Sequence, residues 1–463
     1  MPKQSLPIPP FADKPPSQTP PTAGIRPSPL VPAGAALQDE DIHNPLRRVG
    51  FFFALAFVFV RFTTLHEVLT VKLGFNPYLL YWVGGPAILF LILTGGLQRS
   101  WYWTPVRFWL LYLAWMYAAV PTSTWRSDSL RLAFTYSRTE MVVLFLIAGL
   151  VLTWQECWRT LRWLALAAFV LVLLGHFFSE QLSPEDPRLQ LVAGTMSNSN
   201  DYAALMVIVL PFLVLFVTAP GVPAIFRLAA GLAFIYGLYL VLATGSRGAL
   251  IALVVTALYA LFRLPLAAKI AGLASLSVLS LLLWSFLPDR ITTRLRTISA
   301  TDENVDMTAA ESASARMYLL KQSLRFTFER PLFGVGPGQF ANFEGASARQ
   351  EGEHGSWHDT HNAYTQVSSE AGIPAFLFYV GAIFSTGRLL SRVYKRARSQ
   401  PPTLENRRIA AACLCVMLAF VGFATSVLFL SLAYRFYLPA LSGLTIAMAR
   451  ATDHLWSTPP PAS

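Results

Sequence analysis

Long apolar runs recur along this chain and constrain its fold more than any other feature. A helix that crosses a bilayer needs about 20 mostly apolar residues. Only 13% of the residues are charged, whereas soluble domains have about 25%. The sequence therefore predicts an all-α integral membrane protein with about twelve transmembrane helices. Their candidate spans lie near residues 49–66, 77–97, 104–121, 139–155, 159–178, 202–219, 224–243, 247–263, 267–287, 373–391, 408–430 and 436–450.

One long hydrophilic stretch separates the ninth predicted span from the tenth. Residues 1–45 are rich in proline, as in KPPSQTPP, and have no apolar pattern that could pack, which predicts a disordered or polyproline tail. The predicted organisation is a tail at 1–45, nine helices within 46–287, a loop at 288–372, three helices within 373–450 and a second tail at 451–463.

The orientation of the chain follows from its cations, because short cytoplasmic loops are enriched in Lys and Arg. With the N-terminus in the cytoplasm, the inside loops receive most of the basic residues. One such loop, 392–408, carries Arg392, Lys395, Arg396, Arg398, Arg407 and Arg408. We therefore expect both termini to be cytoplasmic and the 288–372 loop to lie on the opposite side of the membrane.

Five arginines remain on the predicted outer side: Arg126, Arg131, Arg138, Arg188 and Arg247. Such side chains often extend from an apolar surface toward the lipid headgroups without a further role. Arg247 differs because it lies in the tight turn TGSRG between two predicted spans. Flanking glycines allow a ligand to approach the backbone, and a guanidinium fits phosphate oxygens. The pattern favours an anionic, lipid-linked substrate such as a pyrophosphate.

The outer loop contains a predicted amphipathic helix at residues 312–330. Its two sides are the apolar Met317, Leu320, Leu324 and Phe328 and the charged Lys321, Arg325 and Glu329. Such a helix lies on a membrane surface or forms a lid over a cavity, with Arg316 pointing inward. The following PLFGVGPGQF lacks the spacing of a dinucleotide fingerprint, and its glycines predict a tight turn packed on the membrane domain.

Three histidines and an aspartate follow in a short polar segment: His354, His358, Asp359 and His361. They could bind a metal ion, since His and Asp are common zinc ligands, but the glycine-broken segment offers no fixed scaffold. Alternatively, one histidine accepts a proton. His361 is the better candidate because it directly precedes the tenth span. Cys157, Cys413 and Cys415 lie in or beside apolar segments, so no disulfide framework is expected.

Several motifs, taken in order, resemble the O-antigen ligase and O-antigen polymerase superfamily of bacterial envelope glycosyltransferases, and most resemble an O-antigen ligase. They are GTMSNSNDYAALMVIVLPF, TGSRGALIAL and ARMYLLKQSLRFTFERPLFGVGPGQF, followed by the pair His361–Asn362. In the ligases a similar pair precedes nine residues and a Gly-x-x-Gly-like element. Here Gly372 is present, but Ala375 replaces the second glycine.

The resemblance implies a GT-C-like fold in the bacterial inner membrane, with an active site facing the periplasm and no metal or other cofactor. The implied donor is a glycan on undecaprenyl pyrophosphate, and the acceptor is a sugar hydroxyl of lipid A-core. Arg247 and Arg316 are the first candidates for binding the pyrophosphate, with Arg138, Arg188 and Lys321 as additions. His361 would act as the base and Asn362 would orient the ring or the sugar. Asn200 would bind glycan or, as we favour, cap its helix.

Other functions remain open at this point. A polymerase would use the same donor and extend another repeat unit, and a related oligosaccharyltransferase would modify protein Ser or Thr. A secondary transporter would show matched repeats and ionisable residues near the membrane midplane, whereas here the polar residues gather at the outer boundary. Apart from donor and acceptor, the predicted partners are membrane lipids, with no nucleic acid.

Overall fold

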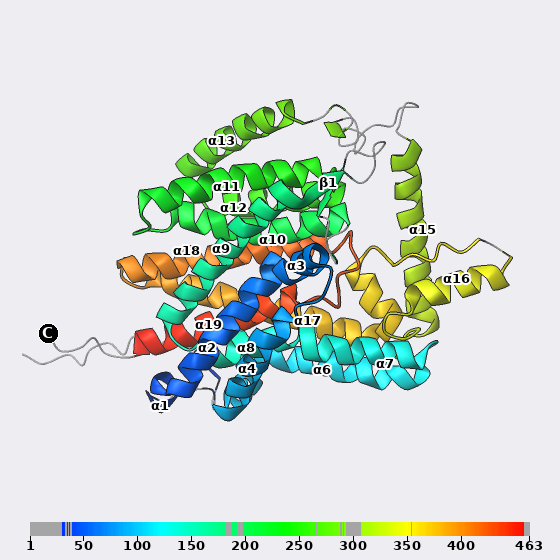
Figure 1. Cartoon of the computed structure of the whole chain (residues 1–463), viewed down its shortest axis with the longest axis horizontal. Coiled ribbons are helices and arrows are strands. Elements are labelled where there is room, and N and C mark those ends of the chain that lie inside the picture. Colours follow the sequence, from blue (N-terminus) through cyan, green and yellow to red (C-terminus); the bar gives the residue numbers. More distant parts are fainter. Residues whose placement is uncertain are drawn as a thin grey trace, which may run out of the picture.

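A computed structural model describes residues 30–32, 35, 37, 39–181, 188–191, 194, 198–264, 266–287, 289, 291–292, 307–352 and 354–457. The predicted tails at 1–45 and 451–463 fall largely or partly outside these residues, as does the start of the predicted loop at 288–372. The described chain is mostly helical (Figure 1).

The first half of the chain folds into helices joined by short turns. These are α1 (Asp39–His43), α2 (Pro45–Thr63), α3 (Leu65–Leu73), α4 (Leu79–Leu93), α5 (Gly96–Trp101), α6 (Thr104–Ala119), α7 (Arg126–Thr135), α8 (Val142–Leu150), α9 (Trp154–Phe178) and α10 (Ser199–Thr218). A 3₁₀ turn, η1 (Val120–Thr122), precedes α7, and a π turn, η2 (Tyr136–Glu140), joins α7 to α8. The strands β1 (Ser179–Gln181) and β2 (Leu189–Leu191) pair antiparallel between α9 and α10.

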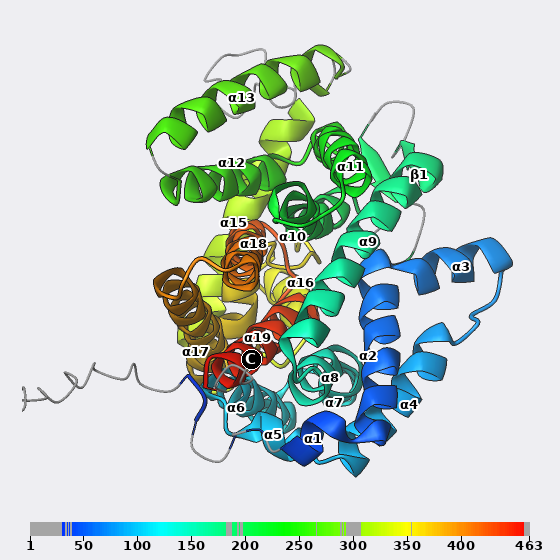
Figure 2. The ribbon, with the colours of Figure 1, turned by 90° about the vertical axis from the view of Figure 1, so that its left-hand side faces the viewer.

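The second half contains the remaining helices. They are α11 (Ala224–Ala243), α12 (Arg247–Phe262), α13 (Leu266–Ser285), α15 (Met307–Glu329), α16 (Phe340–Gln350), α17 (Ala363–Ser399), α18 (Leu404–Ser426) and α19 (Tyr437–Ser457). One core joins both halves, since α17 packs on α6, α10 on α18 and α19 on α8 (Figure 2). Figure 1 shows α15 running across the direction of α10, α11 and α18, at one end of the bundle.

Each of the twelve predicted spans contains a helix. Within the described residues, six helices are long and apolar enough to cross a membrane, or seven if the bent pair α2–α3 counts as one span; α4, α12 and Lys269–Ser285 are shorter apolar helices. The structure therefore has the character of an all-α membrane protein, with one two-stranded exception. The number of crossings stays a prediction. The fourth span begins earlier than predicted, because one candidate span runs from Arg126 to Leu150.

The PLFGVGPGQF turn packs against α17 as predicted. The N–H groups of Val335 and Gly336 donate to the carbonyls of Ser369 and Glu370, each at 2.9 Å. At Gly372 the helix breaks, with φ at +82°, and a Cβ there would lie 2.1 Å from the carbonyl oxygen of Leu332. This break lets the turn dock on α17 and fixes α15 and α16 relative to the membrane helices.

Candidate functional site

Helix α15 brings Arg316 to the end of the bundle where α10 and α12 begin. The helix packs on α16 through Leu319 and Phe326, which contact Phe340 in a small separate core. Three residues of the predicted apolar stripe, Met317, Leu324 and Phe328, are exposed on the other side of the helix. Because Leu319 and Phe326 fix one side of α15, Arg316 is directed toward the bundle.

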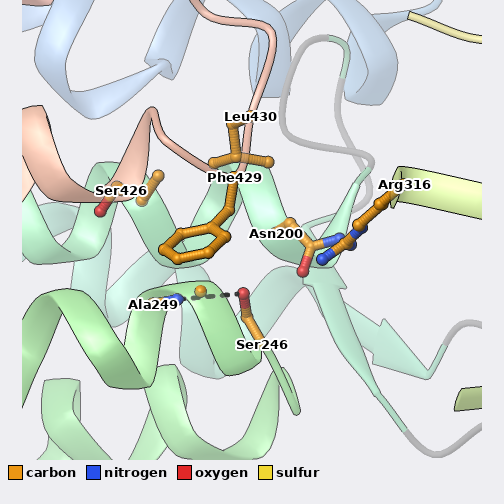
Figure 3. A pocket seen from close by; sticks show the side chains of 9 residues that line it. Asn200, Ser246, Ala249, Arg316, Ser426, Phe429 and Leu430 are labelled. Atoms are coloured by element: carbon orange, nitrogen blue, oxygen red, sulfur yellow. Dashed lines mark hydrogen bonds between the residues drawn. The ribbon is translucent and has the colours of Figure 1, made fainter. Parts of the chain in front are cut away.

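A narrow crevice lies between α10, α12, α15 and the segment that follows α18 (Figure 3). Asn200, Ser246, Arg316 and Phe429 are among its lining residues, and the guanidinium of Arg316 points at the side chain of Asn200. The crevice is too narrow to hold a water molecule in this structure. A substrate that entered here would require its walls to separate.

Three of the predicted arginines gather around this crevice. Burial lowers the pKa of Arg316, and the positive charges of Arg247 and Arg188 lower it further. Within the described part of the chain, the side chain of Arg316 has no hydrogen bond or ion pair. Crowded cations repel one another at this range, so the arrangement favours an anion among them.

The turn that carries Arg247 is built as the sequence suggested, but one of its glycines has another role. Gly245 adopts a φ of +60°, and Ser246 caps α12 by accepting from the N–H of Ala249 at 3.4 Å. A Cβ on Gly248 would lie 2.8 Å from the Cβ of Phe429. Gly248 therefore packs closely on the segment that follows α18, and the approach of a ligand to this backbone stays a prediction.

His361 lies at the start of α17 in an unusual backbone conformation. Its φ is +51°, a value that non-glycine residues rarely adopt. Its N–H donates to the Oγ of Ser431 at 2.8 Å, which ties it to the turn between α18 and α19. Such strain often occurs at functional sites. The hydrogen bond to Ser431 fixes the backbone position from which the imidazole of His361 extends.

Burial lowers the pKa of His361 to about 4, and the positive charges of Arg316 and His358 add to the effect. The imidazole is therefore neutral at neutral pH and has a free lone pair for a proton. An anion bound beside Arg316 would offset that positive charge and make the imidazole more basic. The same arginine thus influences both anion binding and proton acceptance.

Asn362 has a structural role that was not predicted. Its Oδ1 accepts from the N–H groups of Tyr364 and Thr365, at 2.9 and 3.1 Å, and so caps α17. Contact between Asn362 and a sugar stays a proposal. Asn200 was expected to cap α10, and this prediction was wrong. Asn198 caps the helix by accepting a hydrogen bond from the N–H of Asn200 at 2.9 Å. The Asn200 side chain is left to line the crevice.

Two predicted residues are not drawn into this group by any contact in the described structure. Arg138 is exposed and lies over the ring of Phe134, 5.3 Å from its centroid. Lys321 is exposed on α15. Their participation in substrate binding stays a prediction. Among the residues that the structure describes, no three His, Cys, Asp or Glu side chains are grouped so that they could hold a metal ion.

Two charged residues near Asp359 were not predicted from the sequence as part of the site. Arg435 follows Ser431 in the same turn and interacts electrostatically with Asp359 and with Asp201, which is on the first turn of α10. The signal for Arg435 was present, since it lies in the outer turn between the last two predicted spans. Asp201 carried no such signal, because an acidic residue in a first helical turn is ordinary.

Comparison with known proteins found a family that matches the part of the chain that carries Arg316 and His361. Residues 232–380 match the model of a protein family described as O-antigen ligase. The matched residues include Arg247, Arg316 and His361 and the elements from α12 to the first half of α17. No curated protein matches the chain. Through residues 232–380, about a third of its length, the chain is similar to the O-antigen ligase family.

Proposed function

We propose that the protein is an O-antigen ligase. It transfers a glycan from undecaprenyl pyrophosphate to a sugar hydroxyl of lipid A-core during lipopolysaccharide biosynthesis, without a metal ion. The observation that carries the proposal is the position of His361, a neutral base within electrostatic range of Arg316, which is in turn close to Arg247 and Arg188. These are the groups that such a transfer requires.

The reaction exchanges one bond at the anomeric carbon for another. The bond from this carbon to the pyrophosphate oxygen breaks, and the bond to the acceptor oxygen forms. His361 accepts the proton of the acceptor hydroxyl. Arg316, Arg247 and Arg188 stabilise the negative charge that develops on the departing lipid pyrophosphate. A single displacement of this kind inverts the anomeric centre.

Binding of the donor would also prepare the base. The diphosphate neutralises the charge of Arg316, which otherwise holds down the pKa of His361. The imidazole would then become a better proton acceptor only when the donor is bound, which limits wasteful reaction with water. Because the crevice is closed, α15 would have to move away from Asn200 to admit the donor.

In this proposal the chain has about twelve transmembrane helices in a GT-C-like arrangement in the inner membrane. Both termini lie in the cytoplasm and the Arg316 end faces the periplasm. The basic loop at 392–408 supports this orientation, since it lies at the other end of α17 from His361. Lipid A-core in the periplasmic leaflet would then be on the same side of the membrane as His361.

The experiment that tests the proposal is deletion of the gene followed by analysis of lipopolysaccharide and lipid-linked glycans. A ligase predicts lipid A-core without attached glycan, while long glycan chains accumulate on the polyprenyl carrier. Lipid A-core that carries a single repeat unit would instead indicate a polymerase. Unchanged lipopolysaccharide and lipid-linked glycans would contradict both assignments.

A further inference from the structure

A second cavity lies at the opposite end of the bundle from Arg316. Its volume is about 420 Å³, and it opens between the first turns of α9 and α18. Helix α18 has 23 residues and is therefore about 35 Å long. Leu404 at its start lines this cavity, whereas Ser426 at its end lines the crevice of Arg316. The two sites are separate.

Three arginines line this second cavity, against one carboxylate. Arg159 and Arg162 come from α9, Arg408 comes from α18, and the carboxylate belongs to Glu405. Arg162 lies within electrostatic range of both Arg159 and Arg408. In the described part of the chain, the side chains of Arg159 and Arg162 form no ion pair. The cavity thus carries excess positive charge that its own residues do not neutralise.

The guanidinium of Arg408 is held in position. Its Nε donates to the carbonyl of Pro220 at 3.0 Å, its Nη2 donates to that of Gly221 at 3.3 Å, and it lies 5.4 Å from the ring centroid of Trp158. Gly221 has a φ of +75°, and a Cβ there would lie 2.4 Å from Nη2 of Arg408. This arginine is therefore fixed on the cavity wall, whereas Arg159 and Arg162 are exposed and free to adjust.

The aromatic residues of the cavity indicate the depth at which it lies. Trp154 and Trp158 line it, with ring centroids 6.2 Å apart and ring planes tilted by 37°, and both are largely buried. Tryptophan is enriched where membrane helices meet the headgroups, and basic pockets between helices bind anionic headgroups. The cavity therefore combines an apolar wall, of the kind that acyl chains contact, with a cationic wall suited to phosphate.

We propose that this cavity is a binding site for the phosphate of an anionic phospholipid in the adjacent leaflet. Arg159, Arg162 and Arg408 would bind the phosphate oxygens. The carboxylate of Glu405 would accept hydrogen bonds from headgroup hydroxyls, a feature of phosphatidylglycerol. In the orientation proposed above, the leaflet is the cytoplasmic one.

The test uses the purified full-length protein in a neutral detergent, with phosphatidylglycerol, phosphatidylcholine or inorganic phosphate added. Retained lipid is counted by native mass spectrometry and thermal stability is measured in parallel. We expect phosphatidylglycerol to bind and raise the melting temperature, and phosphatidylcholine and phosphate to have little effect. Arg159→Gln/Arg162→Gln should weaken phosphatidylglycerol binding about thirtyfold, since each cation near a membrane surface contributes about 1 kcal/mol.

The matched control is Arg398→Gln/Arg407→Gln. It removes two exposed arginines, one at the end of α17 and one in the first turn of α18, and neither of them lines the cavity. This variant should bind phosphatidylglycerol as the unmodified protein does. Equal losses in both variants would mean general surface attraction and would overturn the proposal. The proposal would also be overturned if inorganic phosphate raised the melting temperature as much as phosphatidylglycerol does, because the occupant would then be a free anion.

Discussion

The backbone N–H of His361 donates a hydrogen bond of 2.8 Å to the Oγ of Ser431, which lies 70 residues further along the chain. The hydroxyl of Thr360 contacts the same oxygen at 3.2 Å. The N–H of Ala363 donates to the carbonyl of Val427 at 2.8 Å. The start of α17 is thus bound to the turn between α18 and α19, and this turn also carries Arg435. The position of the proposed base depends on a segment far from it in sequence.

Removing the hydroxyl at this junction should reduce turnover without preventing folding. We expect Ser431→Ala to lower kcat about fivefold, because a hydrogen bond of this type contributes about 1 kcal/mol and His361 would leave its strained conformation more often. The KM for the donor should change little, since Ser431 does not touch the arginines that would bind it. Steady-state kinetics of glycan transfer in reconstituted vesicles measure both values. Ser356→Ala, in the segment that precedes His361, is the control and should behave as the unmodified protein does.

The pH dependence of transfer should report the charge next to His361. Burial and Arg316 lower the pKa of this residue to about 4, so the neutral base is lost, and the rate falls, only as the pH drops through about 4. Arg316→Gln removes one cause, so the pKa should rise and the rate should begin to fall at a higher pH. The profile of kcat/KM checks this shift. Arg325→Gln, on the exposed side of the same helix, should leave the acid limb in place, and an unmoved limb in Arg316→Gln would contradict the assignment.

The buried carboxyl group of Glu370 also holds the turn between α18 and α19 in place. The hydroxyl of Tyr434 donates to Oε2 of Glu370 at 2.6 Å, and the N–H of Gly338 donates to this oxygen at 2.8 Å. Glu370→Gln and Tyr434→Phe should each lower thermal stability. Because the two side chains share one bond, the double variant should lose less than the sum of the two single losses, by about 1 kcal/mol. Additive losses, measured by thermal unfolding, would mean that the bond contributes nothing.

The break in α17 should tolerate no side chain. Gly372→Ala places a Cβ 2.1 Å from the carbonyl oxygen of Leu332, at a φ of +82°. We expect it to destabilise the protein by at least about 2 kcal/mol. Gly387→Ala is the control in the same helix, because its Cβ would meet only the ring of Phe420, at 3.7 Å. Melting temperatures of the two variants should differ clearly, and similar values would mean that the turn after α15 does not need this break.

The membrane helices could be predicted from sequence because apolar length is a local property. The runs near 202–219 and 408–430 became α10 and α18 with small changes at their ends. The exposed and buried sides of α15 could not be predicted in the same way. Met317, Leu324 and Phe328 form the more regular apolar stripe, yet Leu319 and Phe326 are the buried residues. That choice depends on where Phe340 of α16 lies, which no local pattern specifies.

The candidate site was predictable where a residue broke a membrane rule. Arg247 and Arg188 stood out as cations on the outer side, and the structure places both within electrostatic range of Arg316. The roles of Asn200 and Asn362 were harder to predict, because an asparagine before a helix serves equally well as a cap or as a ligand. Neighbouring residues decided both cases: Asn198 caps α10, and α17 begins directly at Asn362. His361, with its positive φ, is held by a hydrogen bond to a distant turn, and neither feature had a signal in the sequence.

The most direct measurement of the central claim is the rate at which the purified protein, reconstituted in lipid, transfers glycan from a polyprenyl pyrophosphate donor to lipid A-core. His361→Ala should be compared with His354→Ala, an exposed histidine of the same segment. The account predicts that His361→Ala lowers kcat by about 10²- to 10⁴-fold, the usual contribution of a general base, while His354→Ala retains the full rate. An undiminished rate in His361→Ala would contradict it.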